Sequence, residues 1–267
     1  MQNISFDVID VREEVENIKR RGTATKRSCR SDELTEKTCS KNKVLQSNSI
    51  KSIRLRCIKD FHYKPGQFIP IKLPIENDAR GDSRILSISS SPTEKFLQFT
   101  TRISKSPFKQ AFNNLKINDT VYLKNIPMGK FILEESQNAV MITGGIGITP
   151  LRSMIKYAID KILNIKITLF YSNRTQKEIV YRKELEKFSE EYKNFNLINT
   201  VTRSEEDKEW KGPTGRIDAD IIEKYPYEKN SIFYICGAPK MVEAMIKTVK
   251  KLNVPDERIK REDFLGY

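Results

Sequence analysis

The sequence predicts two folded units, an antiparallel β-barrel followed by a doubly wound parallel sheet with helices on both faces. Between residues 43 and 135, short strand-like runs are separated by turn-forming pairs such as Pro65-Gly66, a rhythm typical of a small barrel. From residue 136 to 267, apolar strand-like runs alternate with helical patterns, which is typical of a parallel α/β sheet. Residues 1–42 are predicted to form a polar, flexible N-terminal extension.

The barrel unit carries period-2 patterns and one helical pattern. Strands are expected over residues 50–57, 67–73, 96–103 and 120–123, with a helix over residues 107–115. Ser106 stands at the N-cap position of that helix, so the free backbone N–H groups after it predict an anion site, with plain structural capping as the alternative.

The second unit alternates strand and helix patterns, and the extension carries one helical pattern. Strands are expected over residues 139–143, 165–171, 195–201 and 231–236, and helices over 150–162, 181–191, 218–223 and 239–252. In the extension, Val8, Val11 and Val15 recur at spacings of three and four residues. This spacing predicts one short helix over residues 8–20.

Composition narrows the class of protein. The formal net charge is +13, but basic residues are spread along the chain and mixed with acidic ones, which argues against nucleic-acid binding. A basic surface that steers an acidic protein partner remains open beside a simply lysine-rich composition. The four cysteines form no CxxC pair, so no iron–sulfur cluster, zinc or other metal site is expected on this chain. No transmembrane run and no secretory signal stand out, so the cytoplasm is the expected location.

A glycine-rich segment, Gly144-Gly145-Ile146-Gly147-Ile148-Thr149-Pro150, joins a predicted strand to a predicted helix. Glycines at this position let the backbone approach a pyrophosphate, and the N–H groups at the helix start favour anions. Thr149 is expected to cap the helix or to donate its hydroxyl to a phosphate. The segment therefore predicts a nucleotide site, with a plain glycine turn as the less favoured alternative.

The second predicted strand of this unit indicates which nucleotide binds. An acidic residue that grips an adenosine ribose is expected at the end of that strand, but Tyr171 is followed by Ser172-Asn173-Arg174. A cation at this point suits a 2′-phosphate, so Arg174 favours NADP over NAD. The alternative is that Arg174 is a solvated turn residue.

Three further features have local interpretations. The run from Arg84 to Pro92 combines a guanidinium, which grips phosphate bidentately, with hydroxyls that suit the polar edge of a flat ring. Cys236-Gly237 ends a strand at the ligand edge of the sheet, where a buried small hydrophobe is the alternative to a reactive thiol. The sole histidine, His62, lies in a polar turn, so a Ser–His–acid triad has little support.

Together these residues resemble the ferredoxin–NADP reductase family of flavoenzymes over residues 43–267. The matching landmarks follow in family order: Pro65-Gly66-Gln67-Phe68, Arg84–Ser87, Pro127-Met128-Gly129-Lys130-Phe131, Gly144–Pro150, Cys236-Gly237-Ala238-Pro239 and Glu262–Tyr267. Leu86 stands where many relatives have Tyr, and a leucine cannot donate a hydrogen bond to the flavin's ribityl chain. The iron–sulfur and globin extensions of some relatives have no counterpart here.

The resemblance implies a set of site residues. We call residues 84–92 the flavin segment and residues 144–150 the nucleotide loop. For FAD it implies Arg84 at the pyrophosphate, Ser87 at N5, Leu86, Ile88, Ser89 and Ser90 along the ring, and Ser106 at the phosphates. For NADP or NAD it implies Gly144, Gly145, Gly147, Thr149 and Pro150 at the pyrophosphate and Gly237 near the nucleotide. Arg174 joins this set from the local pattern at the end of the second strand. The implied catalytic group is Ser87, Cys236, Glu262 and Phe264, with Phe264 covering the flavin face that the nicotinamide must reach.

The expected function is that of an FAD-dependent NAD(P)H oxidoreductase that exchanges single electrons with a separate carrier such as ferredoxin or flavodoxin. One alternative is the reductase component of a multi-component oxygenase, desaturase or hydrogenase system. A non-catalytic binding module without flavin is less favoured, because Arg84, Ser87 and the nucleotide loop are intact.

Overall fold

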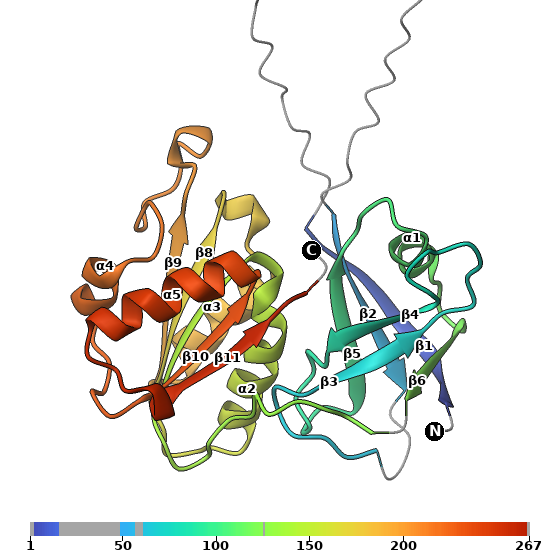
Figure 1. The fold of residues 1–267 in the computed structure, drawn as a ribbon, viewed down its shortest axis with the longest axis horizontal. Coiled ribbons are helices and arrows are strands. Elements are labelled where there is room, and N and C mark those ends of the chain that lie inside the picture. The colour runs from blue at the N-terminus through green and yellow to red at the C-terminus, as the bar shows by residue number, and fades with distance from the viewer. Residues whose placement is uncertain (1–2, 16–48, 57–60, 125, 266–267) are drawn as a thin grey trace, which may run out of the picture.

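The computed structural model describes residues 3–15, 49–56, 61–124 and 126–265. Two sheets share no strand, and Figure 1 shows them side by side. Every strand pair of the first sheet is antiparallel, and every pair of the second is parallel. The predicted fold class is therefore confirmed.

The first sheet has six strands in the order β4-β3-β6-β1-β2-β5. They are β1 (Asn3–Val15), β2 (Ile50–Arg56), β3 (Phe68–Lys72), β4 (Ser83–Ser87), β5 (Phe96–Arg102) and β6 (Thr120–Lys124), and α1 (Pro107–Asn114) lies between β5 and β6. After β4, the backbone N–H of Ser89 donates to the carbonyl of Gln98 on β5 at 2.8 Å. This bond ties the first edge of the sheet to the last. Phe108 and Phe112 of α1 are fully buried in the same apolar core.

The helix predicted over residues 8–20 is wrong for the part that the structure describes. Residues Asn3–Val15 form β1, which pairs with β2 and β6 and buries Phe6 and Val8. Its register against β2 shifts between Val8 and Asp10 and again between Glu13 and Val15. Such bulges insert an extra residue, so a period-2 pattern acquires helix-like spacings. Residues 3–15 thus belong to the first unit rather than to a polar extension, and residues 16–42 lie outside the described part.

The second sheet has the order β11-β10-β7-β8-β9. Its strands are β7 (Ala139–Gly144), β8 (Ile167–Asn173), β9 (Phe195–Val201), β10 (Ile232–Gly237) and β11 (Ile259–Asp263). Its helices are α2 (Ile148–Asp160), α3 (Arg182–Glu191), α4 (Ala219–Lys224) and α5 (Pro239–Lys251), with short 3-10 turns at Gly145–Gly147, Gln176–Glu178, Ser204–Glu206 and Asp256–Arg258.

Helices cover both faces of this parallel sheet. On one face, Met141 and Leu169 of the sheet pack with Leu151 of α2 and Leu185 of α3. On the other face, apolar residues of α4 and α5 pack against the alternate positions of the strands, which include Val140, Ile142, Phe170, Phe233 and Ile235. The alternation of one strand's residues between two cores is what a doubly wound sheet requires.

The described residues contain neither a helix that could span a membrane nor a metal-binding cluster. No helix among them is long and apolar enough to cross a membrane. No group of His, Cys, Asp and Glu among them is arranged to hold a metal ion. Cys29, Cys39 and Cys57 lie outside the described part, and Cys236 is a buried free thiol.

Candidate functional site

The nucleotide loop and Cys236-Gly237 meet at the switch point of the parallel sheet. The chain runs from β7 to β8 on one side, while β10 lies on the other side of β7. A ligand crevice forms where the strand order reverses, beyond the carboxyl ends of the strands. There Thr143 donates its hydroxyl to the carbonyl of Cys236 at 2.8 Å. A Cβ on Gly147 would stand 2.8 Å from that same carbonyl, so the close approach requires glycine.

The nucleotide loop is held by its own strand neighbours. Gly145 has a φ of +55°, a left-handed conformation that suits glycine. Its carbonyl accepts a hydrogen bond from the Tyr171 hydroxyl at 2.8 Å. The predicted cap at Thr149 is wrong, because α2 begins at Ile148 and the Thr149 hydroxyl donates to the carbonyl of Ile146 at 3.2 Å. Thr149 and Pro150 are both buried in the first turn of the helix.

Cys236 is enclosed rather than exposed to the crevice. Its side chain is fully buried, and its Sγ lies 3.0 Å from the carbonyl of Gly147. Burial raises the pKa of this thiol well above its ordinary value, so it stays protonated. These observations favour the buried-hydrophobe interpretation of the sequence. Its proximity to a nicotinamide stays a prediction.

Glu262 and Phe264 stand beside this crevice on the edge strand and just after it. Glu262 is the register partner of Cys236, and the backbone N–H of Phe264 donates to the carbonyl of Gly237 at 2.8 Å. Figure 1 shows β11 (red) as the strand of the second sheet nearest the first unit. Partial burial, with a smaller effect from Asp263, raises the pKa of Glu262 to about 7. Glu262 therefore exchanges a proton near neutral pH at the place where the nicotinamide is expected.

We expect this raised pKa to appear in the pH dependence of stability. The folded protein keeps the Glu262 proton between pH 4.5 and about 7, whereas the unfolded chain releases it. The free energy of unfolding should therefore fall as pH rises through this window, by about 1–2 kcal/mol after solvent screening of this half-buried group. In Glu262→Gln this fall should disappear from thermal melts recorded across the window. Glu243→Gln, at an exposed ion pair on α5, should retain it, and equal slopes in all three proteins would refute the assignment.

The flavin segment spans the end of β4 and the turn after it. Ser87 is half-buried and pairs with Phe68 of β3, while Leu86 and Ile88 pack into the barrel core. The hydroxyls of the next two serines serve the protein itself. Ser89 donates to the carbonyl of Gln98 at 3.0 Å, and the Ser90 hydroxyl lies 2.9 Å from that of Tyr63. Because Ser89 and Ser90 are fully buried and bonded in this way, their predicted roles along a flavin ring stay predictions.

Arg84 lies in an anion site that the protein has filled with one of its own carboxylates. Its Nη2 donates to Asp78 Oδ2 at 2.6 Å, and the backbone N–H of Phe108, at the start of α1, donates to the same oxygen at 3.2 Å. Hydrogen bonds from the N–H of Arg80, from Arg84 and from Phe108 lower the pKa of Asp78, so its carboxyl is ionised. Ser106 caps α1, as predicted, by accepting from the N–H of Lys109 at 3.3 Å.

The charge around this site exceeds what Asp78 neutralises. The Lys109 side chain is held near Arg84, and its pKa is lowered to about 8 by burial and then by the positive charges of Arg84 and Arg80. A guanidinium and a helix N-terminus thus share one carboxylate, and a buried lysine that bonds to Thr101 adds its charge near the guanidinium. This donor set already binds an anion, so it fits a pyrophosphate that would take the place of Asp78. Asp78 and Lys109 were missed in the sequence because nothing in their spacing marks them.

The end of β8 shows a comparable fit for a polar ligand. Arg174 is half-buried just beyond the strand. Its neighbour Asn173 is 5% exposed, and its amide oxygen and nitrogen have no hydrogen-bond partner among the described residues. Leaving a buried amide without partners costs about 1–3 kcal/mol, so a polar ligand that reached it would relieve part of that cost. Asn173 is a second residue that the sequence did not single out.

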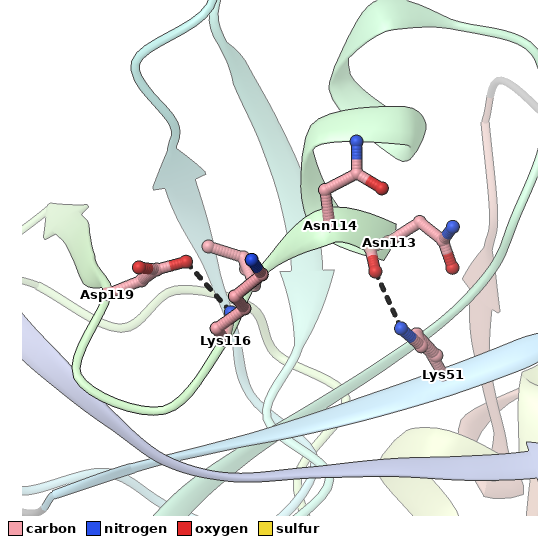
Figure 2. A pocket seen from close by; sticks show the side chains of 6 residues that line it. Lys51, Asn113, Asn114, Lys116 and Asp119 are labelled. Atoms are coloured by element: carbon pink, nitrogen blue, oxygen red, sulfur yellow. Dashed lines mark hydrogen bonds between the residues drawn. The ribbon is translucent and has the colours of Figure 1, made fainter.

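An open pocket elsewhere carries none of the predicted site residues. Figure 2 shows it at the end of α1. It is lined by Lys51, Asn113, Asn114, Leu115, Lys116 and Asp119. Lys51 donates to the carbonyl of Asn113 at 2.6 Å, and Asp119 accepts from the N–H of Lys116 at 2.8 Å. Both bonds join lining residues to each other, and we assign no function to the pocket.

Comparison with known proteins agrees with this geometry. Residues 141–247 match the family model of the oxidoreductase NAD-binding domain. The fold matches that of a ferredoxin–NADP+ reductase from Neisseria gonorrhoeae with bound FAD and NADP, with a TM-score of 0.75 and 16% identity over 98% of this chain and 99% of that one. The chain therefore contains an oxidoreductase NAD-binding domain and has the fold of a ferredoxin–NADP+ reductase.

Curated relatives of the chain are longer than it is. It is 27% identical over 263 residues to one component of the Na+-translocating NADH-quinone reductase of Serratia proteamaculans, covering 81% of this chain and 64% of the relative. It is 29% identical over 215 residues to the reductase component of the glycine betaine monooxygenase of Chromohalobacter salexigens, covering 77% of this chain and 57% of the relative. The chain thus spans less than two thirds of the length of either relative.

Proposed function

We propose that the chain is an FAD-dependent NAD(P)H oxidoreductase that exchanges single electrons with a separate carrier protein. One observation carries this proposal: the helix that follows the nucleotide loop bonds directly to the flavin segment. Ser153 of α2 donates its hydroxyl to the carbonyl of Ser90 at 2.5 Å, and Arg152 donates to the carbonyl of Ser89 at 2.7 Å. These bonds support the proposal that the two predicted cofactor segments belong to one site.

The residues of the chain would hold and orient the two cofactors. Arg84, Lys109 and the N-terminus of α1 would bind the FAD pyrophosphate, and the nucleotide loop would bind that of the nicotinamide nucleotide. Bound FAD would supply the redox chemistry, since it accepts a hydride and gives up electrons one at a time. Ser87 would face the flavin atom that receives the hydride, and Phe264 would cover the ring until the nicotinamide displaces it. Glu262 would hold or release a proton beside the nicotinamide.

We favour NADP over NAD as the nucleotide. Arg174 provides a cation where an acidic ribose ligand is otherwise expected, and the unpartnered amide of Asn173 lies next to it. An acidic residue at the end of β8 would instead have supported NAD.

The proposed partner is an acidic electron carrier of the ferredoxin or flavodoxin kind. The net charge of +13 would speed the encounter with such a protein, and we expect the rate to fall as salt is added. We propose the cytoplasm as the location.

A reductase component of an oxygenase system is the second candidate. It is supported by the 29% identity to the reductase component of a glycine betaine monooxygenase. Assays of the reduced protein with ferredoxin, flavodoxin, cytochrome and quinone acceptors distinguish the two. Rapid turnover with a free carrier supports the main proposal, whereas turnover only with a co-purified metalloprotein supports the second. A purified protein that has no flavin spectrum and cannot be reconstituted with FAD would contradict both.

A further inference from the structure

One buried guanidinium bonds to residues of both units at the interface between them, which we call the seam. Arg152 lies in the first turns of α2, two residues after the nucleotide loop, and its side chain is 1% exposed. We propose that Arg152 is a positioning residue that fixes the flavin segment against the nucleotide loop and thereby sets the distance for hydride transfer. This inference rests on the proposed function.

Every N–H of the Arg152 guanidinium has an acceptor, and the acceptors come from both units. Nη1 donates to the carbonyl of Ser89 at 2.7 Å and to Glu94 Oε2 at 2.8 Å, while Nη2 donates to Glu94 Oε1 at 3.2 Å. Nε donates to Glu184 Oε2 at 2.8 Å, and Nη2 also donates to Glu184 Oε1 at 2.6 Å. A guanidinium has five N–H donors in a rigid fork, so this arrangement uses its whole capacity.

The two carboxylates belong to different parts of the protein. Glu94 lies in the turn just after the flavin segment, and its carboxylate also accepts from the backbone N–H of Ser91 at 2.7 Å. Glu184 lies on α3 of the second unit. Arg152 therefore connects the flavin segment to two helices of the parallel-sheet unit. A lysine could offer the charge at this point but not the planar fork that reaches both carboxylates and the carbonyl.

The ion pairs keep this side chain charged despite its burial. Burial by itself lowers the pKa of Arg152, but hydrogen bonds to Glu94 and Glu184 outweigh it and raise the pKa above its ordinary value. Breaking one partner would leave a buried charge uncompensated, which is strongly unfavourable. The geometry of the seam is thus tightly determined.

Neighbouring contacts hold the same parts together. Tyr181, directly before α3, has a φ of +59° and shares a buried hydrogen bond with the hydroxyl of Thr100 on β5. The guanidinium carbon of Arg152 lies 5.4 Å from the centre of the Tyr181 ring. Ser153, the next residue on α2, bonds to the carbonyl of Ser90. A displacement of the nucleotide loop would therefore move groups that are bonded to the flavin segment.

Hydride transfer is sensitive to this kind of displacement. The reacting atoms must lie about 3–3.5 Å apart, and a misplacement of about 1 Å costs on the order of 100-fold in rate. All five N–H groups of Arg152 bond to acceptors of the protein, so none is left to hold a cofactor. Its loss should therefore change the transfer step and leave the affinity for each cofactor nearly unaltered.

Arg152→Lys tests the proposal, with Arg182→Lys as the matched control. Arg182 bonds to Gln176 and Glu186 inside the second unit only. In Arg152→Lys, the rate of flavin reduction at saturating nucleotide should fall about 100-fold. The FAD dissociation constant and the nucleotide KM should stay within about twofold of wild type. Arg182→Lys should match wild type in every measurement. An unchanged reduction rate, or a loss of FAD affinity as large as the loss of rate, would overturn the positioning role.

A second measurement needs no cofactor. Calorimetry of the cofactor-free protein should show one unfolding transition in wild type and Arg182→Lys. In Arg152→Lys we expect two transitions, because the two units no longer unfold together. A single transition in Arg152→Lys would overturn the coupling. If wild type is not reduced by either nucleotide, the proposed function fails and the positioning role fails with it, while a split transition in Arg152→Lys would still establish that Arg152 joins the two units.

Discussion

Ser87→Val should slow flavin reduction about 100- to 1000-fold while FAD remains bound. Ser87 ends β4 at the point where the resemblance implies the flavin N5, and valine removes its hydroxyl while placing two methyl groups on the same carbon. Removing one preorganised hydrogen-bond donor from a site of developing charge costs this much in comparable enzymes. Stopped-flow reduction by excess nucleotide measures the step, and the bound flavin is counted from its visible absorbance.

The matched control for this change lies on the same strand. Ser83→Val replaces the same side chain at the opposite end of β4, where Ser83 pairs with Lys72. The flavin in this variant should be reduced at the wild-type rate, because Ser83 lies at the end of β4 away from the expected flavin N5. A general effect of valine on the strand would instead slow both variants equally. Equal rates in Ser87→Val and wild type would remove Ser87 from the proposed site.

Arg84→Met should weaken FAD binding about 100-fold, which corresponds to ~2.7 kcal/mol. Charge-assisted hydrogen bonds contribute about 1.5–3 kcal/mol each, and methionine fills much of the same space without a charge. Fluorescence titration of the cofactor-free protein with FAD gives the dissociation constants. Arg84 also stabilises its own loop, because Nη1 donates to the carbonyls of Gly81 and Ser83 at 2.8 Å each. A loss of FAD affinity in Arg84→Met therefore needs a second variant that separates the two roles.

Asp78→Asn separates phosphate binding from loop bracing. Asp78 occupies the donors that the pyrophosphate would use, so removing its charge should leave FAD affinity unchanged or raise it. If Arg84 serves only to hold the loop through Asp78, both variants should instead lose affinity. A parallel loss in Asp78→Asn and Arg84→Met would therefore contradict the phosphate-binding role. Asp82→Asn, at an exposed pair with Lys72, controls for the charge change on this loop.

Most regular elements could be predicted because their patterns are local. The strand over residues 195–201 has the predicted bounds, and α1 and α5 each end one residue before the predicted position. The strand β1 was misjudged because its two bulges disturb the period of two. The strand β11 was missed because Ile259–Asp263 carries four charged residues on the half-exposed edge of the sheet, where no apolar alternation is needed.

The site could be predicted only in its parts. A run of glycines indicates phosphate binding, and a cluster of hydroxyl residues after an arginine indicates flavin binding, each from a few neighbouring residues. The nucleotide loop and the flavin segment could therefore be recognised separately. Arg152 and Glu94 are 58 positions apart, and a local pattern does not reveal that a helix residue will be buried between two carboxylates. The same holds for Asp78, whose carboxylate meets the N–H of Phe108 from 30 positions away. Contacts of this kind depend on how the two units pack.

Anaerobic titration of the FAD-reconstituted protein with NADPH, and separately with NADH, tests the proposed activity most directly. We expect the absorbance of oxidised flavin to fall in proportion to the nucleotide added, with NADPH acting faster than NADH at equal concentration. Flavin that binds to the protein but stays oxidised with both nucleotides would contradict the proposal that the two segments form one site for hydride transfer.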